Sequence, residues 1–420
     1  MSAKIQAIFI DRKNKKVIGE AQVMAPPPDP ISAFQAFLNT VNPLSQGPPP
    51  RELAPTPSSL NYSIDLFRFT DSFDFQIALA PDEDFNVRSH DFVEFVVFEN
   101  ETTKRQIGVG VIESITKETT ATKRILKANG RDLLGQFITI PFNVQLKKEP
   151  LTMRRFVDRM IRGSYLEEYL NFRKPSLPKI SDLGSFQLQM LFMSDLEQKK
   201  AQIAQQYAEL AINLIYMNHQ GQVELLGRAG TFGSTAPART RSPIGILRKG
   251  ENVESFIVLS NFTGVFSEFT LFYSSGEAIQ DINTNPGSKF INTDPRVSGH
   301  IFQPEFRTFN TTDLVTLGGA VNFTRRIRDV AKSLIRKSNR DLNSVVATVS
   351  SPFFSLADGT ERAFHVGDLF VLQSNEREFT SRARPNGTDT VQMILTGINY
   401  SQNETSLGVQ LRFHEVDTLL

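Results

Sequence analysis

The chain has 420 residues, enough for about two to four domains with cores of their own. Its 46 Lys and Arg residues balance 45 Asp and Glu residues, so the net charge of +1 does not call for a nucleic-acid or anionic-membrane partner. The absence of cysteine excludes a disulfide framework, a thiolate zinc site and a cysteine nucleophile. The 34 phenylalanines, against 7 tyrosines and no tryptophan, predict a β-rich protein with extensive apolar packing.

The N-terminal region divides into three predicted parts. Residues 1–24 alternate around DRKNKK and predict a β-hairpin. Residues 25–59 are rich in proline, which predicts an extended arm or linker without ladder hydrogen bonds. Residues 60–140 predict a first antiparallel β-barrel, because FDFQIAL, DFVEFVVF, QIGVGVIESI and TKRILKANG follow at hairpin spacing. No run approaches the ~20 apolar residues of a membrane helix, so we expect no membrane insertion.

The segment RILKANGRDLLGQF (124–137) changes from strand-like alternation to a helical pattern. Asn129, Gly130, Arg131 and Asp132 stand at the change. Asn and Gly suit tight backbone conformations, and Asp132 is placed to accept a hydrogen bond from a backbone N–H at the start of a helical turn. Arg131 is expected to pair across the junction or with a neighbouring subunit. We interpret the four residues as a structural corner and expect Gly130→Val to damage folding or assembly and no catalytic step.

The middle of the chain mixes helices and strands. Residues 141–240 predict an α/β domain with a helix over 151–162, whose apolar stripe faces inward. A second helix is expected from Ser194 through Leu214 to NHQG, before the strand QVELLG. Residues 241–345 combine strands such as ESFIVLS with a long basic helix near 320–337. We interpret its basic face as solvated or as an inter-subunit contact, in preference to a phosphate-binding face.

The C-terminal residues 346–420 predict a second β-barrel, built from GDLFVLQ, TVQMILTGINY and SLGVQLRFHEVD. Its strand order repeats that of residues 60–140, and the acidic corner RFHEVD stands where KANGRD stands in the first barrel. We interpret this match as an internal duplication. The predicted fold class is therefore α+β and β-rich, with two similar small antiparallel β-barrels and inserted or adjacent α/β domains.

The search for chemistry nominates no catalytic, cofactor-binding or metal-binding residue. The five histidines lack zinc-site spacing, and GRAGTFGS lacks the lysine of a phosphate-binding loop. The acidic turn DEDFN lacks the glycine and the bidentate Glu of a calcium loop. Glycosidase chemistry needs two positioned carboxylates, and 45 acidic residues single out no pair. We expect no cofactor and no enzymatic activity.

In the order and spacing of its segments the chain resembles the baseplate hub proteins of contractile phage tails, of the kind found in phage Mu. The resemblance covers roughly residues 60–420 and extends to the hub part of type VI secretion spike proteins. It is carried by DSFDFQIAL, GVGVIESI, KANGRDLLGQF, NHQGQVELLGR, LRKGENVESFIVLSNFTGVFSEFTLFYSSG, the basic helix and HVGDLFVLQ with MILTGINYSQNETSLGVQLRF. The arm over 25–59 departs from the family pattern.

The resemblance implies a structural protein of the virion that is made in the bacterial host cytoplasm. It implies a homotrimer whose two barrels per subunit form a pseudo-sixfold ring. That ring joins tail-tube or tube-initiator proteins above to a spike protein below, contacts surrounding baseplate proteins and leaves a channel for DNA as transient cargo. Two other functions stay open: a tail-associated cell-wall hydrolase, and a β module that binds the host surface or a carbohydrate.

Overall fold

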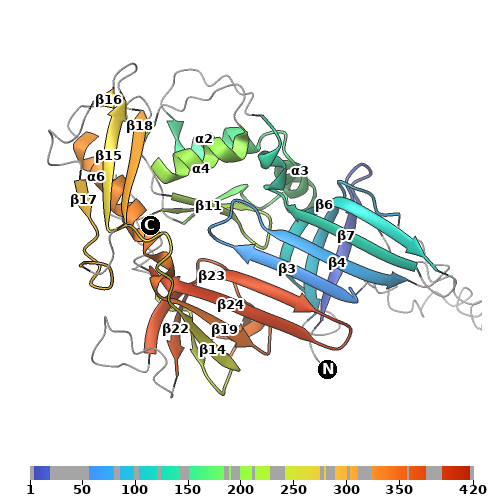
Figure 1. The fold of residues 1–420 in the computed structure, drawn as a ribbon. Coiled ribbons are helices and arrows are strands. Elements are labelled where there is room, and N and C mark those ends of the chain that lie inside the picture. Colours follow the sequence, from blue (N-terminus) through green and yellow to red (C-terminus); the bar gives the residue numbers. More distant parts are fainter. Residues whose placement is uncertain are drawn as a thin grey trace, which may run out of the picture.

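The computed structural model shows a β-rich α+β fold, as the sequence predicts (Figure 1). It describes residues 4–18, 56–79, 86–98, 104–120, 124–141, 151–183, 189–190, 199–210, 213–227, 242–274, 279–280, 289–299, 303–310, 323–356, 359–374 and 390–416. Most of the predicted proline-rich arm lies outside these residues. A 13-stranded sheet dominates the fold and consists of two strand groups.

The first strand group comes from the N-terminal third of the chain. Its members are β1 (Ile5–Asp11), β2 (Lys16–Ile18), β3 (Ser59–Asp65), β4 (Ser72–Leu79), β5 (Phe92–Phe98), β6 (Lys104–Thr119) and β7 (Arg124–Asp132). They lie in the order β3-β4-β7-β6-β5-β1-β2, and every neighbouring pair is antiparallel. The four apolar residues of FDFQIAL are buried in β4 and the residues between them are exposed, as period-two alternation predicts. The opening hairpin is β1–β2, and β1 also pairs with β5.

The second strand group comes mostly from the C-terminal part. Its members are β13 (Gly245–Arg248), β14 (Ser255–Leu259), β19 (Ser344–Val349), β22 (Leu369–Gln373), β23 (Thr390–Gln402) and β24 (Leu407–Glu415). The strands β14, β19, β24, β23 and β22 are antiparallel neighbours in that order, and β13 adds to β22 in parallel. Two of these strands, β13 and β14, lie within residues 241–345, so the group extends beyond residues 346–420.

Strands β3 and β23 join the two groups edge to edge, and we call this pairing the internal junction. It is antiparallel, with Tyr62 opposite Tyr400 and Leu60 opposite Gln402. The side chain of Gln402 is buried here and links β23 to the backbone of β1. Its Nε2 donates to Ile5 O (3.1 Å), and its Oε1 accepts from Ile5 N (2.7 Å). Within the residues that the structure describes, no strand pairing closes either group on itself.

The two groups share one irregularity at the same place. A β-bulge interrupts the β6–β7 ladder between Ile112 and Ser114, and another interrupts the β23–β24 ladder between Leu395 and Gly397. The last residue pair before the bulge is Ile112 with Gly130 in the first group, and Leu395 with Phe413 in the second.

The same two backbone hydrogen bonds occur at each bulge, and they join the residue before the bulge to the segment that leads into the neighbouring strand. They are His90 N to Ile112 O (2.7 Å) and Ile112 N to Asp91 O (3.0 Å) in the first group, and Gly367 N to Leu395 O (2.7 Å) and Leu395 N to Asp368 O (2.8 Å) in the second. His90 and Gly367 both have positive φ, 73° and 90°. The matching bulges, hydrogen bonds and positive φ values make the two groups equivalent residue by residue around the bulges, which agrees with the predicted duplication.

Buried aromatic rings fill one side of the sheet across the internal junction. Tyr62 stacks on Tyr400 with ring centroids 6.2 Å apart, and it lies 5.1 Å from Phe95. Phe95 in turn meets Phe73 edge-on at 5.0 Å. The phenylalanine content of the chain is therefore used in a continuous core that spans both groups.

The α/β part follows β7 and covers the junction between the groups (Figure 1). It contains η1 (Gly135–Ile138), β8 (Leu151–Thr152), α2 (Met153–Ile161), α3 (Tyr165–Arg173), β9 (Ile180–Leu183), β10 (Gln189–Met190), α4 (Lys200–Leu210), β11 (Asn213–Met217) and β12 (Val223–Gly227). The predicted stripe of α2 is buried, and Thr152 caps the helix by accepting from Arg155 N (3.2 Å).

One helix prediction was wrong in extent. The helix expected to run to NHQG ends at Leu210, and Asn213–Met217 forms strand β11, which pairs with β12 as a hairpin. NHQG is the hairpin turn, where Gly221 has a φ of 86° that favours glycine. Leu214, which the helix prediction counted in an inward stripe, pairs with Leu226 across the hairpin. The predicted start near Ser194 lies outside the described residues.

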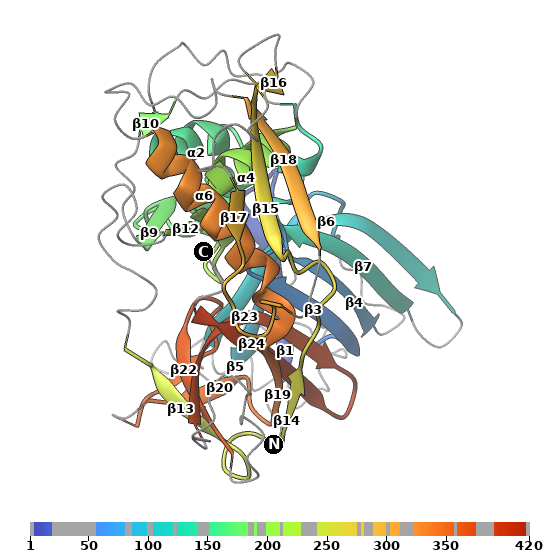
Figure 2. The same cartoon turned by 60° about the vertical axis from the view of Figure 1, so that its left-hand side comes forward.

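A third part packs a helix on a small sheet (Figure 2). It contains β15 (Glu268–Ser274), β16 (Ile279–Gln280), β17 (Lys289–Ile291), β18 (Pro304–Asn310), α6 (Phe323–Ser338) and η5 (Arg340–Leu342). A separate hairpin of β20 (Phe353–Ser355) and β21 (Glu361–Ala363) lies between β19 and β22 in the chain. The helix α6 is the predicted basic helix. Its residues Val330, Ala331, Leu334 and Ile335 are buried.

Candidate functional site

The predicted corner forms the end of β7. Asn129, Gly130, Arg131 and Asp132 are its last four residues, and the chain then turns into η1. Asn129 and Gly130 therefore lie in a strand and not in the tight turn expected from their types. The glycine has a different reason: a β-carbon at position 130 would lie 2.0 Å from the carbonyl oxygen of Val111 on β6. Only glycine allows β6 to approach this closely.

Asp132 is the buried end of the corner. Its Oδ1 accepts from the backbone N–H of Leu134 (3.0 Å), at the entrance to η1, as the sequence predicts. Its Oδ2 accepts from the N–H of Asp71 (3.0 Å), the residue before β4. Asp71 uses its own Oδ1 to accept from Asp65 N (2.9 Å) at the end of β3. Two carboxyl groups thus hold the ends of β3, β4 and β7 together.

Burial changes the acidity of this pair. It raises the pKa of Asp132 to about 7, although the N–H groups of Asp71 and Leu134 act in the opposite direction. Burial, and then the charge of Asp132, raise the pKa of Asp71 well above its usual range. The two groups titrate as a pair. The corner therefore holds a proton at pH values where exposed carboxyl groups are ionised.

Arg131 pairs within the chain. Its Nε donates to Glu113 Oε1 (2.8 Å), and Glu113 is the extra residue of the β6 bulge. The equivalent positions in the second group are His414 and Thr396, whose Nδ1 and Oγ1 lie 2.6 Å apart. Burial lowers the pKa of His414 to about 4, so this ring is neutral at pH 7.

The counterpart of Asp132 is Glu415, the last residue of β24. Its Oε1 accepts from Asn343 Nδ2 (2.7 Å), and its Oε2 accepts from Arg296 (3.1 Å). Arg296 also forms a 2.7 Å ion pair with Asp294. Each strand group therefore ends in an acidic side chain that ties its last strand to a neighbouring segment. The sequence match between KANGRD and RFHEVD points to the right segment, and the strand registers assign Glu415 within it.

The side of the sheet opposite the aromatic core is polar on five neighbouring strands, and on β19 and β14 the same side carries Val346, Ile257 and Leu259. Across β7, β4, β3, β23 and β24, the residues on this side are mainly Asn129, Lys127, Arg131, Ser72, Asp74, Gln76, Asn61, Ser63, Asn399, Ser401, Gln410 and Arg412. We call this surface the polar face. Asn61 donates to Asp74 across β3–β4 (3.0 Å). Lys127 pairs with Glu118 at 2.7 Å and Arg131 with Glu113 at 2.7 Å, so each of these two basic residues lies beside an acidic one.

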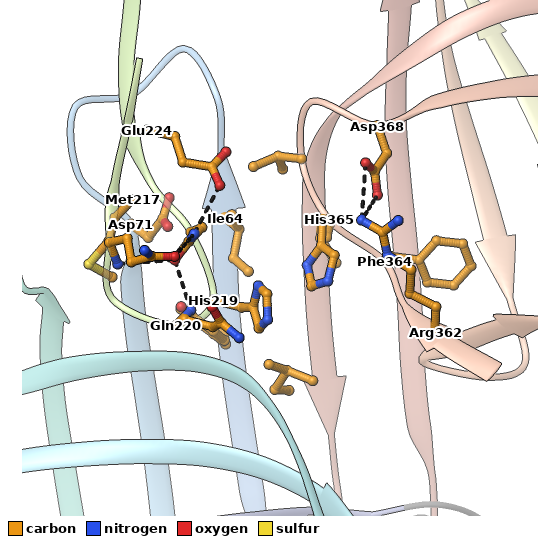
Figure 3. Close-up of a pocket in the computed structure, with 16 residues that line it drawn as sticks. Ile64, Asp71, Met217, His219, Gln220, Glu224, Arg362, Phe364, His365 and Asp368 are labelled. Carbon is orange, nitrogen blue, oxygen red and sulfur yellow. Dashed lines mark hydrogen bonds and ion pairs between the residues drawn. The ribbon is translucent and has the colours of Figure 1, made fainter. Parts of the chain in front are cut away.

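A cavity of about 270 Å³ lies where the α/β part meets both strand groups (Figure 3). His219, from the β11–β12 turn, and His365, before β22, stack across it with ring centroids 3.8 Å apart. Arg362 forms an ion pair with Asp368 (3.1 Å) on the side of the cavity that belongs to the second strand group. Glu224 accepts a hydrogen bond from Asn218 (2.9 Å) on the side that belongs to the α/β part.

The cavity is a poor site for a cation. Burial, and then the positive charges of neighbouring groups, lower the pKa of His219 well below its usual value. Burial and the charge of Arg362 lower the pKa of His365 to about 4. Among the described residues, no group of three or more His, Asp or Glu side chains is arranged to hold a metal ion. The stacked pair can instead fix the β11–β12 turn against the second group.

One strong contact gave no sequence signal. Glu94 of β5 is buried and receives Arg173 of α3 through Nε (2.9 Å) and Nη2 (3.0 Å), with Tyr169 as a third donor (2.8 Å). Burial opposes ionisation, but the hydrogen bonds and charge of Arg173 lower the pKa of Glu94. The partners lie 79 residues apart, so only the fold brings them together.

The described residues contain no helix long and apolar enough to cross a bilayer.

The fold is shared with phage tail proteins. The tail protein from Neisseria meningitidis MC58 superposes with a TM-score of 0.61 over 86% of this chain and 94% of its own, at 15% sequence identity. The 43 kDa tail protein of prophage MuSo2 from Shewanella oneidensis gives a TM-score of 0.59 over 87% of this chain and 95% of its own, at 11% identity. A component of the type VI secretion system of E. coli superposes with a TM-score of 0.43 over 85% of this chain and 72% of its own, at 8% identity. No family model and no curated protein matches the sequence.

Proposed function

We propose that the chain is a structural hub of a contractile phage tail baseplate, in which three copies form a pseudo-sixfold ring between the tail tube and the central spike. The observation that carries this proposal is the residue-level equivalence of the two strand groups. A three-fold assembly can match a six-fold tube if each chain supplies two equivalent modules. The shared fold with two phage tail proteins supports the same conclusion.

The polar face has the character needed for a channel wall. It carries hydroxyl and amide groups on several neighbouring strands, and acidic groups accompany Lys127 and Arg131. A wall with unpaired basic residues would bind the phosphates of passing DNA and retain it. In the proposed ring the polar face lines the channel, and the aromatic layer lies behind it.

The other parts of the chain would face the surroundings of the ring. The α/β part is anchored to the first group by the Glu94–Arg173 pair and to the second by the stacked histidines. The third part extends away from the sheet (Figure 2). These parts are available for contacts with spike and baseplate proteins, and the corner at Asn129 to Asp132 sets where the α/β part leaves the ring.

Two measurements test the proposal. Native mass spectrometry of the purified chain should give the mass of three 47.1 kDa chains. Gold-labelled antibodies against the chain should mark the baseplate end of intact tailed particles. A monomer that forms no ring with tube or spike proteins contradicts the proposal, as does a label confined to another part of the particle. Clearing of peptidoglycan in a zymogram by the purified chain would favour a hydrolase instead.

A further inference from the structure

We propose that β14 of one copy pairs antiparallel with the second half of β6 of the next copy, with Ile257 opposite Glu118 and Leu259 opposite Thr116. The inference rests on the proposed ring and names the surface that closes it. The partner is a second copy of this chain, and the contact is an intermolecular repeat of the internal junction.

The internal junction provides the template. There β3 pairs with β23, with Asn61 opposite Ser401 and Ser63 opposite Asn399. The contact uses the half of β23 that follows its bulge. It is buried on the aromatic side and continues the polar face without a gap.

The registers of the duplicated groups identify the equivalent strands. Ser63 pairs with Ser72 in the first group, and Leu259 pairs with Ser344 in the second. Ser72 lies opposite Arg131 and Ser344 lies opposite His414, which are equivalent positions at the two corners. Strand β14 is therefore the counterpart of β3.

The same comparison makes β6 the counterpart of β23. Ser114 follows the bulge in β6 as Gly397 follows the bulge in β23. Counting along both strands gives Thr116 as the equivalent of Asn399, and Glu118 as that of Ser401. Applying the internal register to β14 and β6 gives the proposed pairs.

Both strands present a surface suited to this contact. Strand β14 stands at the end of the sheet, and its side chains Ile257, Val258 and Leu259 are 53%, 41% and 43% exposed. Three consecutive exposed apolar residues on an edge strand template pairing with another chain. In the described part of the chain, β6 has β7 as its strand neighbour over Ser114–Thr119, because β5 pairs with the first half of β6.

A single chain cannot make this contact. Strands β19, β24, β23, β3, β4 and β7 separate β14 from β6, so seven inter-strand spacings of ~4.8 Å, roughly 34 Å along the sheet, lie between them. The two strands belong to different strand groups and lie far apart in the sheet (Figure 1). The contact is head-to-tail, and such contacts form closed rings when the rotation between copies allows closure.

Disulfide trapping tests the register directly, because the chain contains no cysteine. Directly opposed residues in an antiparallel pair have Cα atoms about 4.5–5.5 Å apart, within the range of a disulfide. Under mild oxidation, the double variant Ile257→Cys with Glu118→Cys should give a covalent trimer on a non-reducing gel. Ile257→Cys with Thr116→Cys is shifted by two residues on the same face and should give at least tenfold less trimer.

The internal junction provides the matched control. Asn61→Cys with Ser401→Cys occupies the equivalent register position within one chain, so it should form a disulfide in a monomeric band. If this control oxidises and native mass spectrometry shows a trimer, yet the Ile257–Glu118 pair does not cross-link, the pairing is refuted and the ring survives. If native mass spectrometry shows only monomer, the proposed function falls as well.

A charge variant gives an independent readout. Ile257→Asp replaces an exposed side chain and places a carboxylate opposite Glu118, so the chain should fold normally and become monomeric. Ile291→Asp is the control, because Ile291 is an isoleucine on β17 that is 65% exposed and outside the proposed contact. It should remain trimeric. A folded, trimeric Ile257→Asp variant refutes the proposed contact.

Discussion

Gly130 offers a quantitative test of how closely β6 and β7 pack at the corner. In Gly130→Ala, the new methyl group would lie 2.0 Å from the Val111 carbonyl oxygen and 2.5 Å from Cζ of Phe73. Ordinary contacts begin at 3.4 Å, so the strands would have to separate by more than about 1 Å. Phe73 has no room to move, because its ring packs against Phe95 at 5.0 Å.

The expected cost is that of overpacking a close-packed core. Such insertions cost about 1–3 kcal/mol, and the short distance to a backbone atom places Gly130→Ala at the upper end. For cooperative units of about 150–250 residues, each kcal/mol lowers the melting temperature by ~2–4 °C. Thermal melts and urea titrations of the purified variant should therefore show a loss of several degrees, and Gly130→Val should fail to fold or assemble.

Gly408→Ala is the matched control. Gly408 also lies in a strand, β24, but the nearest atom to its β-carbon would be Ser401 O at 3.6 Å, an ordinary contact. Alanine there should be neutral or slightly stabilising, since glycine in a strand costs about 0.5–1 kcal/mol relative to alanine. Equal stability of Gly130→Ala and Gly408→Ala would refute the close approach of β6 as the reason for glycine at position 130.

Two further predictions concern buried charges. Arg173→Met leaves the Glu94 carboxylate buried without its cation and should lower the free energy of unfolding, measured in urea, by about 3–5 kcal/mol. Adding Glu94→Gln to this variant should recover most of the loss. If the effects of the two substitutions simply add, the pairing is contradicted. The pKa of Asp132 is about 7 in the folded protein and ~3.9 when unfolded, so the folded state binds the proton more tightly. Stability should therefore fall as pH rises from about 4 through 7, with a slope of at most ~1.4 kcal/mol per pH unit for this group. Asp132→Asn should flatten that dependence between pH 5 and 8, although the variant itself is less stable; an unchanged slope would show that Asp132 does not hold the proton.

Local patterns in the sequence predict local structure well in this chain. The alternation in β4 and the apolar stripe of α2 each depend on one element burying one side, and both appear as expected. The error at Leu214 has the same origin, since LIYM fits a helical stripe and a short strand equally well. The hairpin with β12 decides in favour of the strand, and a partner strand is not visible in a local window.

Contacts between distant segments were beyond the reach of such patterns. The internal junction joins residues near 60 to residues near 400, and Asp132 is held by Asp71, 61 residues away. Sequence order nonetheless suggested that the two strand groups are related, because a duplicated fold keeps its bulges, turns and corner carboxylates in order. The reason predicted for glycine at position 130 was wrong. Glycine is required there because β6 approaches closely, and not because of the backbone angle φ of residue 130.

The ring itself is the central claim, and electron cryo-microscopy of the purified assembly tests it most directly. Two-dimensional class averages viewed along the axis should show six similar lobes around a central opening, with true three-fold symmetry from the α/β and third parts on the outside. The six lobes correspond to two strand groups from each of three chains. Averages that show isolated chains, or an assembly in which the two groups of a chain do not occupy equivalent places around one opening, would contradict the account.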